Sequence, residues 1–222
     1  MIIAALILPF ALLQADAANA TAAADRFAQC RARIDADPVN AYEEAMAWAG
    51  EAHTLNAYRC AAMALLAQNR HEEGARRLES LAVALNPAQA TLRADLLSQA
   101  GNAWLLAREP GQARSAFTRA ISTIESDPSQ LPDLLIDRAR AYAMERDWRH
   151  AEEDLSRSLD IRPGSSLALR LRATARMHQS VFDLAEADAL EAARLEPANV
   201  DNYLTLGHVR ESRRIGAPIE EQ

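Results

Sequence analysis

The second half of the chain contains an internal repeat, and this self-similarity constrains the fold more than any other feature of the sequence. Residues 135–163 align without a gap with residues 169–197, and the closing prolines, Pro163 and Pro197, lie 34 positions apart. A fixed period of this length is typical of arrays in which each repeat is one supersecondary unit. Such a unit cannot bury its apolar face alone, so the sequence predicts that several units stack on one another.

The composition indicates that these units are helical. Alanine dominates the hydrophobic half of the chain, and leucine, arginine and glutamate are frequent; all four are strong helix formers. Aromatic residues make up only 5% of the 222 residues, and the 7 glycines leave little material for hairpin turns. We therefore expect an all-α chain of antiparallel helix pairs, each joined by a short turn. A helical bundle without repeats is the alternative.

Small and large apolar residues recur in a fixed order along the chain. A large apolar residue precedes a small one and an aromatic; after a turn come alanine, an aromatic or leucine, a second alanine and a closing proline. The positions that carry this order are Ala62, Leu66, Ala75, Leu78, Ala82 and Pro87; Leu97, Gly101, Trp104, Ala113, Phe117, Ala120 and Pro128; Leu135, Tyr142, Ala151, Leu155, Ser158 and Pro163; Leu169, Ala185, Ala189, Ala192 and Pro197; and Tyr203, Leu206 and Gly207. This pattern, from Asn56 to Arg214, resembles the tetratricopeptide repeat (TPR) family. It departs where Ser158 replaces the second alanine and where Arg176 stands in place of an aromatic residue.

The resemblance implies a right-handed superhelical solenoid of antiparallel helix pairs, in which the first helix of each pair lines a concave face. We expect the array to occupy residues 56–199. Residues 21–55 are predicted to form capping helices, the first of which ends at Pro38. Residues 200–222 are predicted to form a capping helix with a polar outer face, followed by a loose tail.

The first 20 residues have the pattern of an export signal. An apolar run from Met1 to Leu13 precedes two small-x-small sites, which allow cleavage after Ala17 or Ala20. The run is shorter than the roughly 20 apolar residues that cross a bilayer. It departs from the usual signal-peptide pattern in that no Lys or Arg precedes it. We expect a signal peptide at residues 1–20 and a periplasmic or otherwise exported protein of bacterial type. A buried hydrophobic helix is the alternative, and membrane contact is expected only if the segment stays uncleaved.

The two cysteines, Cys30 and Cys60, are a candidate disulfide. An even number of cysteines in an exported chain is compatible with one bond, whereas in a cytosolic chain the same pair would be two buried thiols. Cys30 shares one helical face with Phe27 and Ile34. We expect a disulfide that ties the leading cap to the first full repeat.

No motif for catalysis, metal binding or cofactor binding occurs in the sequence. Phosphate loops, dinucleotide fingerprints and nucleophile elbows are absent. The acidic pairs Glu72/Glu73 and Glu152/Glu153 are interpreted as solvated first turns of second helices. The net charge is −7 and every basic residue is an arginine interleaved with acids, so we expect neither nucleic acid nor a small-molecule substrate as a partner. Five dispersed histidines are assigned surface or structural roles: His53, His71, His150, His178 and His208.

The resemblance places one residue of each first helix at equivalent concave positions. These are Asn102, Arg140, Thr174 and His208, and one turn earlier Ser98, Ile136, Arg170 and Leu204. Arginine can hold a carboxylate with two parallel hydrogen bonds, and asparagine can bond a peptide group. We therefore predict a groove for an extended or carboxyl-terminal segment of a protein partner. The alternative is that Arg140 and Arg170 merely pair with Asp137 and Glu186.

These observations predict a non-enzymatic scaffold or adaptor of the cell envelope that binds proteins or peptides in its concave groove and needs no cofactor. The family resemblance implies protein–protein interaction but leaves the partner open. A membrane-anchored TPR subunit of an envelope assembly or maturation complex is the alternative function. An enzymatic function is not expected, because its polar catalytic groups would all have to be assembled from distant positions in the sequence.

Overall fold

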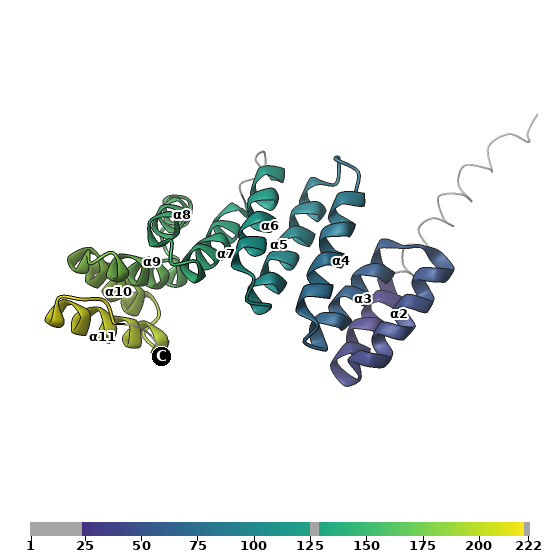
Figure 1. The fold of residues 1–222 in the computed structure, drawn as a ribbon, viewed down its shortest axis with the longest axis horizontal. Coiled ribbons are helices and arrows are strands. Elements are labelled where there is room, and N and C mark those ends of the chain that lie inside the picture. The colour runs from purple at the N-terminus through teal and green to yellow at the C-terminus, as the bar shows by residue number, and fades with distance from the viewer. Residues whose placement is uncertain (1–23, 125–128, 220–222) are drawn as a thin grey trace, which may run out of the picture. The chain divides into compact units, whose positions relative to one another are not determined.

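The computed structural model describes residues 24–124 and 129–219, and the expected signal peptide at residues 1–20 lies outside these ranges. Within them every regular element is a helix and no strand occurs, so the all-α prediction is confirmed. None of these helices is long and apolar enough to cross a membrane. In chain order they are residues 24–36, α2 (Pro38–Ala52), α3 (Leu55–Ala67), α4 (His71–Ala84), α5 (Ala90–Leu106), α6 (Pro110–Thr123), α7 (Leu131–Met144), α8 (Trp148–Ile161), α9 (Ser166–His178), α10 (Phe182–Leu195) and α11 (Val200–Ile215) (Figure 1).

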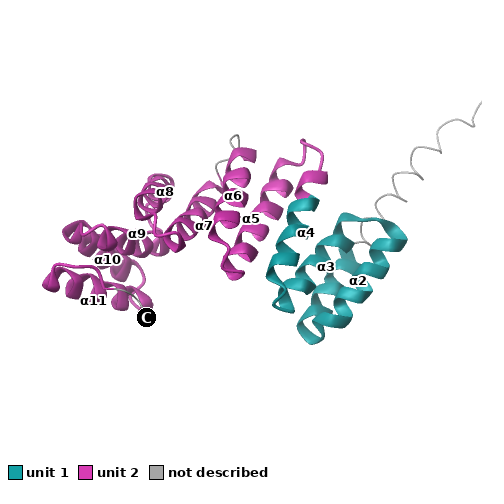
Figure 2. Cartoon of the chain, in the orientation of Figure 1, with its two compact units in different colours: residues 1–81 teal, residues 82–222 magenta. Residues whose placement is uncertain are grey.

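The chain divides into two compact units, coloured separately in Figure 2. Unit 1 extends to Leu81 and contains the helix at 24–36, α2, α3 and most of α4; unit 2 begins at Ala82 and contains α5 to α11. Within unit 2, α5 packs on α6, α7 on α8 and α9 on α10, and each pair packs on the next one. The last helix, α11, contacts both α9 and α10. Unit 2 is therefore a stack of helix pairs, as the repeat predicts.

Capping side chains determine where several helices begin. Asp37, Thr54, Asp147 and Ser165 each accept a hydrogen bond from a backbone N–H in the first turn of α2, α3, α8 and α9, respectively. Such a bond satisfies one of the N–H groups that a helix start leaves free. Pro38 is the first residue of α2, where its missing N–H is not needed. It therefore opens one helix as well as ending the preceding one.

The turns that join α3 to α4, α5 to α6, α7 to α8 and α9 to α10 share one geometry. Asn69, Arg108, Arg146 and Ser180 have φ values of 60°, 60°, 59° and 62°, and the next helix begins two residues later in each case. This left-handed conformation lets the following backbone N–H reach back to a carbonyl of the first helix. Side chains other than glycine are disfavoured there. The recurrence at equivalent sites indicates that helix packing, more than local sequence, imposes the turn.

The turns correct the alignment of the first repeat. Gly74 lies five positions after Asn69 (74 − 69), just as Ala113 lies five positions after Arg108 (113 − 108). Gly74, and not Ala75, is thus the small residue equivalent to Ala113. A Cβ atom added at Gly74 would collide with the Leu66 side chain of α3. The sequence alignment is wrong by one residue here because alanine, the usual residue, stands next to the glycine.

Small residues allow the paired helices to approach closely. Ala113, Ala151 and Ala185 are completely buried in second helices. In α5, a Cβ atom added at Gly101 would lie 2.6 Å from the ring of Phe117 in α6, closer than real Cβ contacts allow. The ring therefore packs directly on the α5 backbone, which is the interlocking that ridge-and-groove packing requires.

Two repeats also contain a buried ion pair between their first and second helices. Arg138 donates through Nε and Nη2 to both carboxylate oxygens of Asp154, each at 2.7 Å. Arg172 makes the same two bonds to Asp188 at 2.8 Å, and both residues lie 34 positions after their counterparts (172 − 138 and 188 − 154). Asp154 and Asp188 are 6% exposed. The polar pair is thus a repeated core element that the sequence analysis did not anticipate.

Arg176 extends the second of these pairs into a network. Its Nη1 donates to Asp188 at 2.8 Å and its Nε to Glu152 of the preceding repeat at 2.7 Å. Gln179 also donates to Glu152 at 2.7 Å. Burial raises the pKa of Glu152, but the bonds from Arg176 and Gln179 outweigh it and hold that pKa below its ordinary value. The expectation that Glu152 is a solvated first-turn residue is therefore wrong, since it joins two repeats.

Candidate functional site

The residues predicted to bind a ligand lie on successive first helices of unit 2. Asn102 is on α5, Arg140 on α7, Thr174 on α9 and His208 on α11. We use the term first-helix surface for these residues and their neighbours on the same helices: Ser98, Asn102, Asp137, Arg140, Arg170, Thr174, Asp201, Leu204 and His208.

Asp137 joins α5 and α7 at this surface. Asn102 Nδ2 donates to one carboxylate oxygen of Asp137 and Arg140 Nη1 to the other, both at 3.2 Å. The Arg140 side chain is 50% exposed. A surface ion pair of this kind contributes about 0–1 kcal/mol. Asp137 therefore orients Arg140 without committing its guanidinium, which can exchange to a ligand carboxylate.

Arg170 is more buried than Arg140 and less completely bonded. Its side chain is 23% exposed, and its Nη2 lies 3.9 Å from a carboxylate oxygen of Asp201 on α11. Its Nε is buried and has no hydrogen-bond acceptor among the residues that the structure describes. A buried donor left without an acceptor costs about 1–3 kcal/mol. Glu186, the alternative partner considered from the sequence, instead binds Arg210 and Arg213.

The remaining predicted positions differ in character. The Thr174 hydroxyl donates to the backbone carbonyl of Arg170 at 3.3 Å. His208 is half-buried on α11, and Leu204 is exposed. Ile136 is only 4% exposed and packs in the core around Leu155, so it does not face a ligand. The surface is therefore a discontinuous polar row with one exposed leucine.

A small apolar cavity opens beside two of the predicted residues. Arg140 and Thr174 lie at its margin, and Trp148, Leu155 and Leu171 contribute to its apolar wall. Its volume is about 120 Å³, well below the roughly 300–1,000 Å³ of small-molecule sites. The cavity can accept one short aliphatic side chain next to a guanidinium group.

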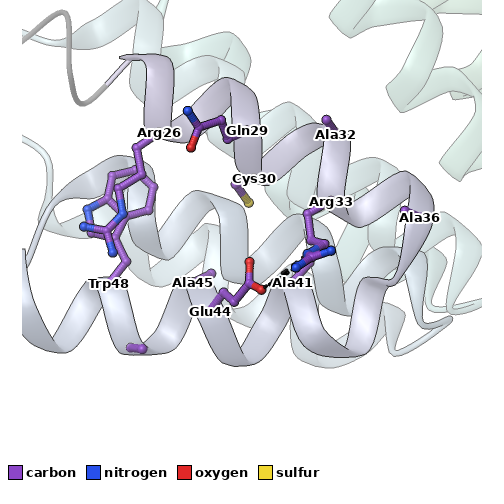
Figure 3. Close-up of a pocket in the computed structure, with 11 residues that line it drawn as sticks. Arg26, Gln29, Cys30, Ala32, Arg33, Ala36, Ala41, Glu44, Ala45 and Trp48 are labelled. Atoms are coloured by element: carbon purple, nitrogen blue, oxygen red, sulfur yellow. Dashed lines mark hydrogen bonds and ion pairs between the residues drawn. The ribbon is translucent and has the colours of Figure 1, made fainter.

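A larger cavity of about 650 Å³ lies in unit 1, between the helix at 24–36 and α2 (Figure 3). Its charged residues are already paired. Arg26 stacks on the Trp48 ring at 5.0 Å and binds Glu51, and Arg33 binds Glu44 at 3.0 Å. Figure 3 shows Arg33 turned toward Glu44 across the cavity. Both arginines of this cavity therefore already pair with carboxylates of unit 1.

The structure brings Cys30 and Cys60 together. The two residues form a disulfide between the helix at 24–36 and α3, and their Cα atoms lie 6.3 Å apart. This separation meets the geometric requirement of a disulfide, which is less than about 7 Å. Cys60 is completely buried and packs with Ile34, Ala41 and Ala45. Oxidation of the pair in the protein's own compartment stays a prediction.

Two carboxylates of the first-helix surface were missed by the sequence analysis as parts of the site. Asp137 was considered only as a competitor for Arg140, and Asp201 was not considered at all. Asp137 precedes Arg140 by one helical turn, a spacing that could have assigned it. Asp201 lies on a different helix from Arg170, so sequence spacing could not reveal their proximity. Among the described residues, no group of three or more His, Cys, Asp or Glu side chains could hold a metal ion.

No protein-family model matches the chain, but curated proteins are similar to part of it. Sperm-associated antigen 1 of Mus musculus is 29% identical over 132 residues, which are 56% of this chain and 15% of that protein. Protein unc-45 homolog B of Danio rerio is 28% identical over 127 residues, 57% of this chain and 13% of that protein. The chain thus spans less than one sixth of the length of these relatives.

Solved structures show the fold. MamA residues 41-end from Desulfovibrio magneticus RS-1 superpose with a TM-score of 0.59 and 16% identity, covering 72% of this chain and 86% of that one. The first TPR of Spaghetti (RPAP3), bound to the HSP90 peptide SRMEEVD, superposes with a TM-score of 0.51 and 23% identity, covering 55% of this chain and 94% of that one. The chain has a TPR-like fold.

Proposed function

We propose that this TPR-like protein is a non-enzymatic scaffold that binds extended, acidic segments of other polypeptides on the first-helix surface. One arrangement carries the proposal. Arg140 and Thr174 flank the apolar cavity, and Arg170, one turn before Thr174, has a buried Nε without an acceptor. A carboxylate that accepts from the half-exposed Arg140 guanidinium would lie next to an aliphatic side chain in the cavity, and Arg170, 23% exposed, offers a second guanidinium one turn before Thr174.

The energetics favour exchange of partners at this site. The Arg140–Asp137 pair is half exposed and weak, and Arg170 approaches Asp201 only to 3.9 Å. A ligand carboxylate that binds a guanidinium with two parallel bonds makes a stronger contact than either of these. Asp137 and Asp201 also repel an acidic ligand that lacks the correct register. They would therefore make the site selective for the position of the carboxylate.

The similarity to peptide-binding TPR structures supports this choice of ligand. In the complex of the first TPR of Spaghetti, the peptide SRMEEVD contains three acidic residues and ends in a carboxylate. We propose the same chemical class for this chain, an acidic segment with an aliphatic residue beside the carboxylate.

We further propose that the protein acts in the cell envelope after export. The signal-like pattern of residues 1–20 supports this location, and so does the Cys30–Cys60 pair, because disulfides persist in oxidising compartments.

Selection from a library tests the ligand class. Random heptapeptides displayed with a free carboxyl terminus are selected on the purified full chain, and the enriched peptides are synthesised and titrated by fluorescence anisotropy. We expect enrichment of peptides with a carboxylate next to an aliphatic residue. For these peptides, the double variant Arg140→Ala/Arg170→Ala should lose more than about tenfold in affinity, since truncating one bonded charge at an interface costs about 2–5 kcal/mol.

The matched control is Arg149→Ala/Arg194→Ala, which removes two exposed arginines from second helices and changes the net charge equally. This control should retain the affinity to within about twofold, because exposed ion pairs contribute little. Residual binding by the first double variant should become insensitive to salt. Equal affinities of wild type and a folded Arg140→Ala/Arg170→Ala variant would place the ligand on another face, and a selection without enrichment would contradict the proposal.

A further inference from the structure

The last helix, α11, keeps the face with which the other first helices bind their second helices, but here that face is open. Counted by the 34-residue period, Tyr203, Gly207 and Arg210 are equivalent to Leu169, Ala173 and Arg176 of α9 (203 − 169, 207 − 173 and 210 − 176). In each of the other first helices of unit 2, the first two of these three positions are buried. The residues are Leu97 and Gly101 in α5, Leu135 and Ala139 in α7, and Leu169 and Ala173 in α9.

On α11 the equivalent residues are exposed. Tyr203 is 49% and the neighbouring Val200 68% exposed. Gly207 is also exposed, and a Cβ atom added to it would meet nothing within 4 Å, whereas one added to Gly101 would strike the Phe117 ring. The polar outer face expected of this capping helix is thus interrupted by three uncharged residues, although Asp201, Arg213 and Arg214 of the same helix are exposed. We use the term α11 outer face for Val200, Tyr203, Gly207 and Arg210.

The charges of the repeat indicate what chemistry fits this face. Arg176 binds two carboxylates, Glu152 of the preceding repeat and Asp188 of the second helix that covers it. Arg210 makes the first of these contacts in the same way, with Nε at 2.7 Å from Glu186. In the described part of the chain no second carboxylate binds Arg210, whose side chain is 56% exposed. The equivalent of Asp188 is the missing half of the arrangement.

We propose that the α11 outer face binds an amphipathic helix of a partner protein, which packs antiparallel to α11 as the second helix of an additional repeat. The partner helix has the pattern small-x-x-Asp-apolar-x-x-small, as in Ala185, Asp188, Ala189 and Ala192 of α10. Its aspartate binds Arg210, and its apolar side chain packs over Gly207 as the Phe117 ring packs over Gly101. The helix pairs α5–α6, α7–α8 and α9–α10 provide the template for this interface. The α11 outer face shares its helix, but no residue, with the first-helix surface, to which α11 contributes Asp201, Leu204 and His208.

The test uses a peptide whose contacts are defined by the chain itself. The probe is a hydrocarbon-stapled, fluorescently labelled peptide with the sequence 181–196 and the substitution Ala189→Phe, which supplies a ring for the space above Gly207. Stapling is needed because isolated helices of this length are marginal in water. We expect saturable binding to the full chain in fluorescence anisotropy. The same probe with Asp188→Ala should bind wild type about fivefold to tenfold more weakly, since one charge-assisted hydrogen bond is lost, and should bind an Arg210→Ala variant no differently from the parent probe.

Gly207→Arg is the blocking variant, because the position is open and an added side chain leaves the fold intact. It should weaken probe binding at least about tenfold, as expected for a clash at the centre of an interface. Gly50→Arg, at another open glycine on α2, is the matched control and should leave binding within about twofold. Absence of saturable binding, or equal binding to wild type and Gly207→Arg, would overturn the proposal. Concentration-dependent dimers in sedimentation, dissociated by Gly207→Arg, would also overturn it by identifying a second copy as the occupant.

Discussion

Removing the Asp188 carboxylate should destabilise unit 2 more than any exposed charge change. In the structure Asp188 accepts three hydrogen bonds of 2.8 Å, two from Arg172 and one from Arg176. The side chains of Arg172 and Arg176 are only 17% and 14% exposed. The variant Asp188→Ala therefore leaves two largely buried guanidinium groups facing a space without a counter-charge.

The size of the destabilisation in Asp188→Ala depends on which hydrogen bonds the two arginines keep. Arg176 keeps its bond to Glu152, whereas Arg172 keeps only the Ser156 hydroxyl at 3.2 Å. Leaving a buried charge uncompensated costs about 3–5 kcal/mol. For a chain of this size each kcal/mol lowers the melting temperature by roughly 2–4 °C, so Asp188→Ala should melt roughly 6–20 °C below wild type.

Thermal unfolding followed by circular dichroism at 222 nm measures this loss. Asp154→Ala breaks the equivalent pair in the preceding repeat, where a single arginine, Arg138, is left behind, and should cost less than Asp188→Ala. Asp183→Ala is the exposed control; its side chain is 82% exposed and pairs with the exposed Arg213, so its melting temperature should change by less than about 2 °C. A melting temperature for Asp188→Ala within the range of the Asp183→Ala control would refute the reasoning.

Arg172→Met/Asp188→Leu distinguishes loss of the pair from loss of packing. The first repeat of unit 2 has Ala100 and Ala116 at the equivalent positions, both completely buried, so the site tolerates apolar residues. Replacing both members of a buried ion pair by apolar groups is often neutral or stabilising, and Arg176, the other partner of Asp188, keeps its bond to Glu152. The double variant should therefore melt well above Asp188→Ala. If the two variants melt together, the penalty comes from packing and not from the unpaired charge.

Two further predictions concern the disulfide and acid stability. The Cys30–Cys60 bond closes a loop with a sequence separation of 30, so reduction should destabilise unit 1 by about 3–4 kcal/mol in the chain-entropy model. Intact mass and alkylation of protein from the native envelope measure the bond and cleavage after Ala17 or Ala20; free thiols would contradict the export proposal, whereas an intact Met1 would favour the membrane-anchored alternative. The pKa of Glu152 is depressed in the fold, so its contribution to stability is complete above its ordinary value of about 4.5 and is lost as the pH falls through the lower folded value. Glu152→Gln should therefore show a flatter decline of melting temperature with acid than wild type, and a decline as steep as that of the exposed control Glu153→Gln would contradict the assignment.

The helix pairs were predictable from the sequence because their determinants are local and periodic. The apolar spacing of Leu135 and Leu169, the prolines after α8 and α10, and the small residues Ala151 and Ala185 repeat at 34 positions, so each repeat reports on the others. The same logic placed Asn102, Arg140 and Thr174 at equivalent positions of successive first helices. The same logic misaligned the first repeat by one residue. It matched Ala75 to the alanines of the other repeats, whereas the position of the turn makes Gly74 the equivalent residue.

The all-α class, the helix pairs and the residues that each first helix contributes thus follow from the sequence. Which charges on different helices meet depends on the tertiary structure. Arg176 departs from the family pattern in sequence, yet it lies between Glu152 and Asp188. Arg170 approaches Asp201 and not Glu186. Val200 and Tyr203 are exposed on α11, where a polar cap was expected. The two kinds of interaction differ in the sequence separation over which they act. Helix formation depends on neighbours within one or two turns, whereas ion pairing depends on side chains that only the packing of separate helices brings within about 4 Å.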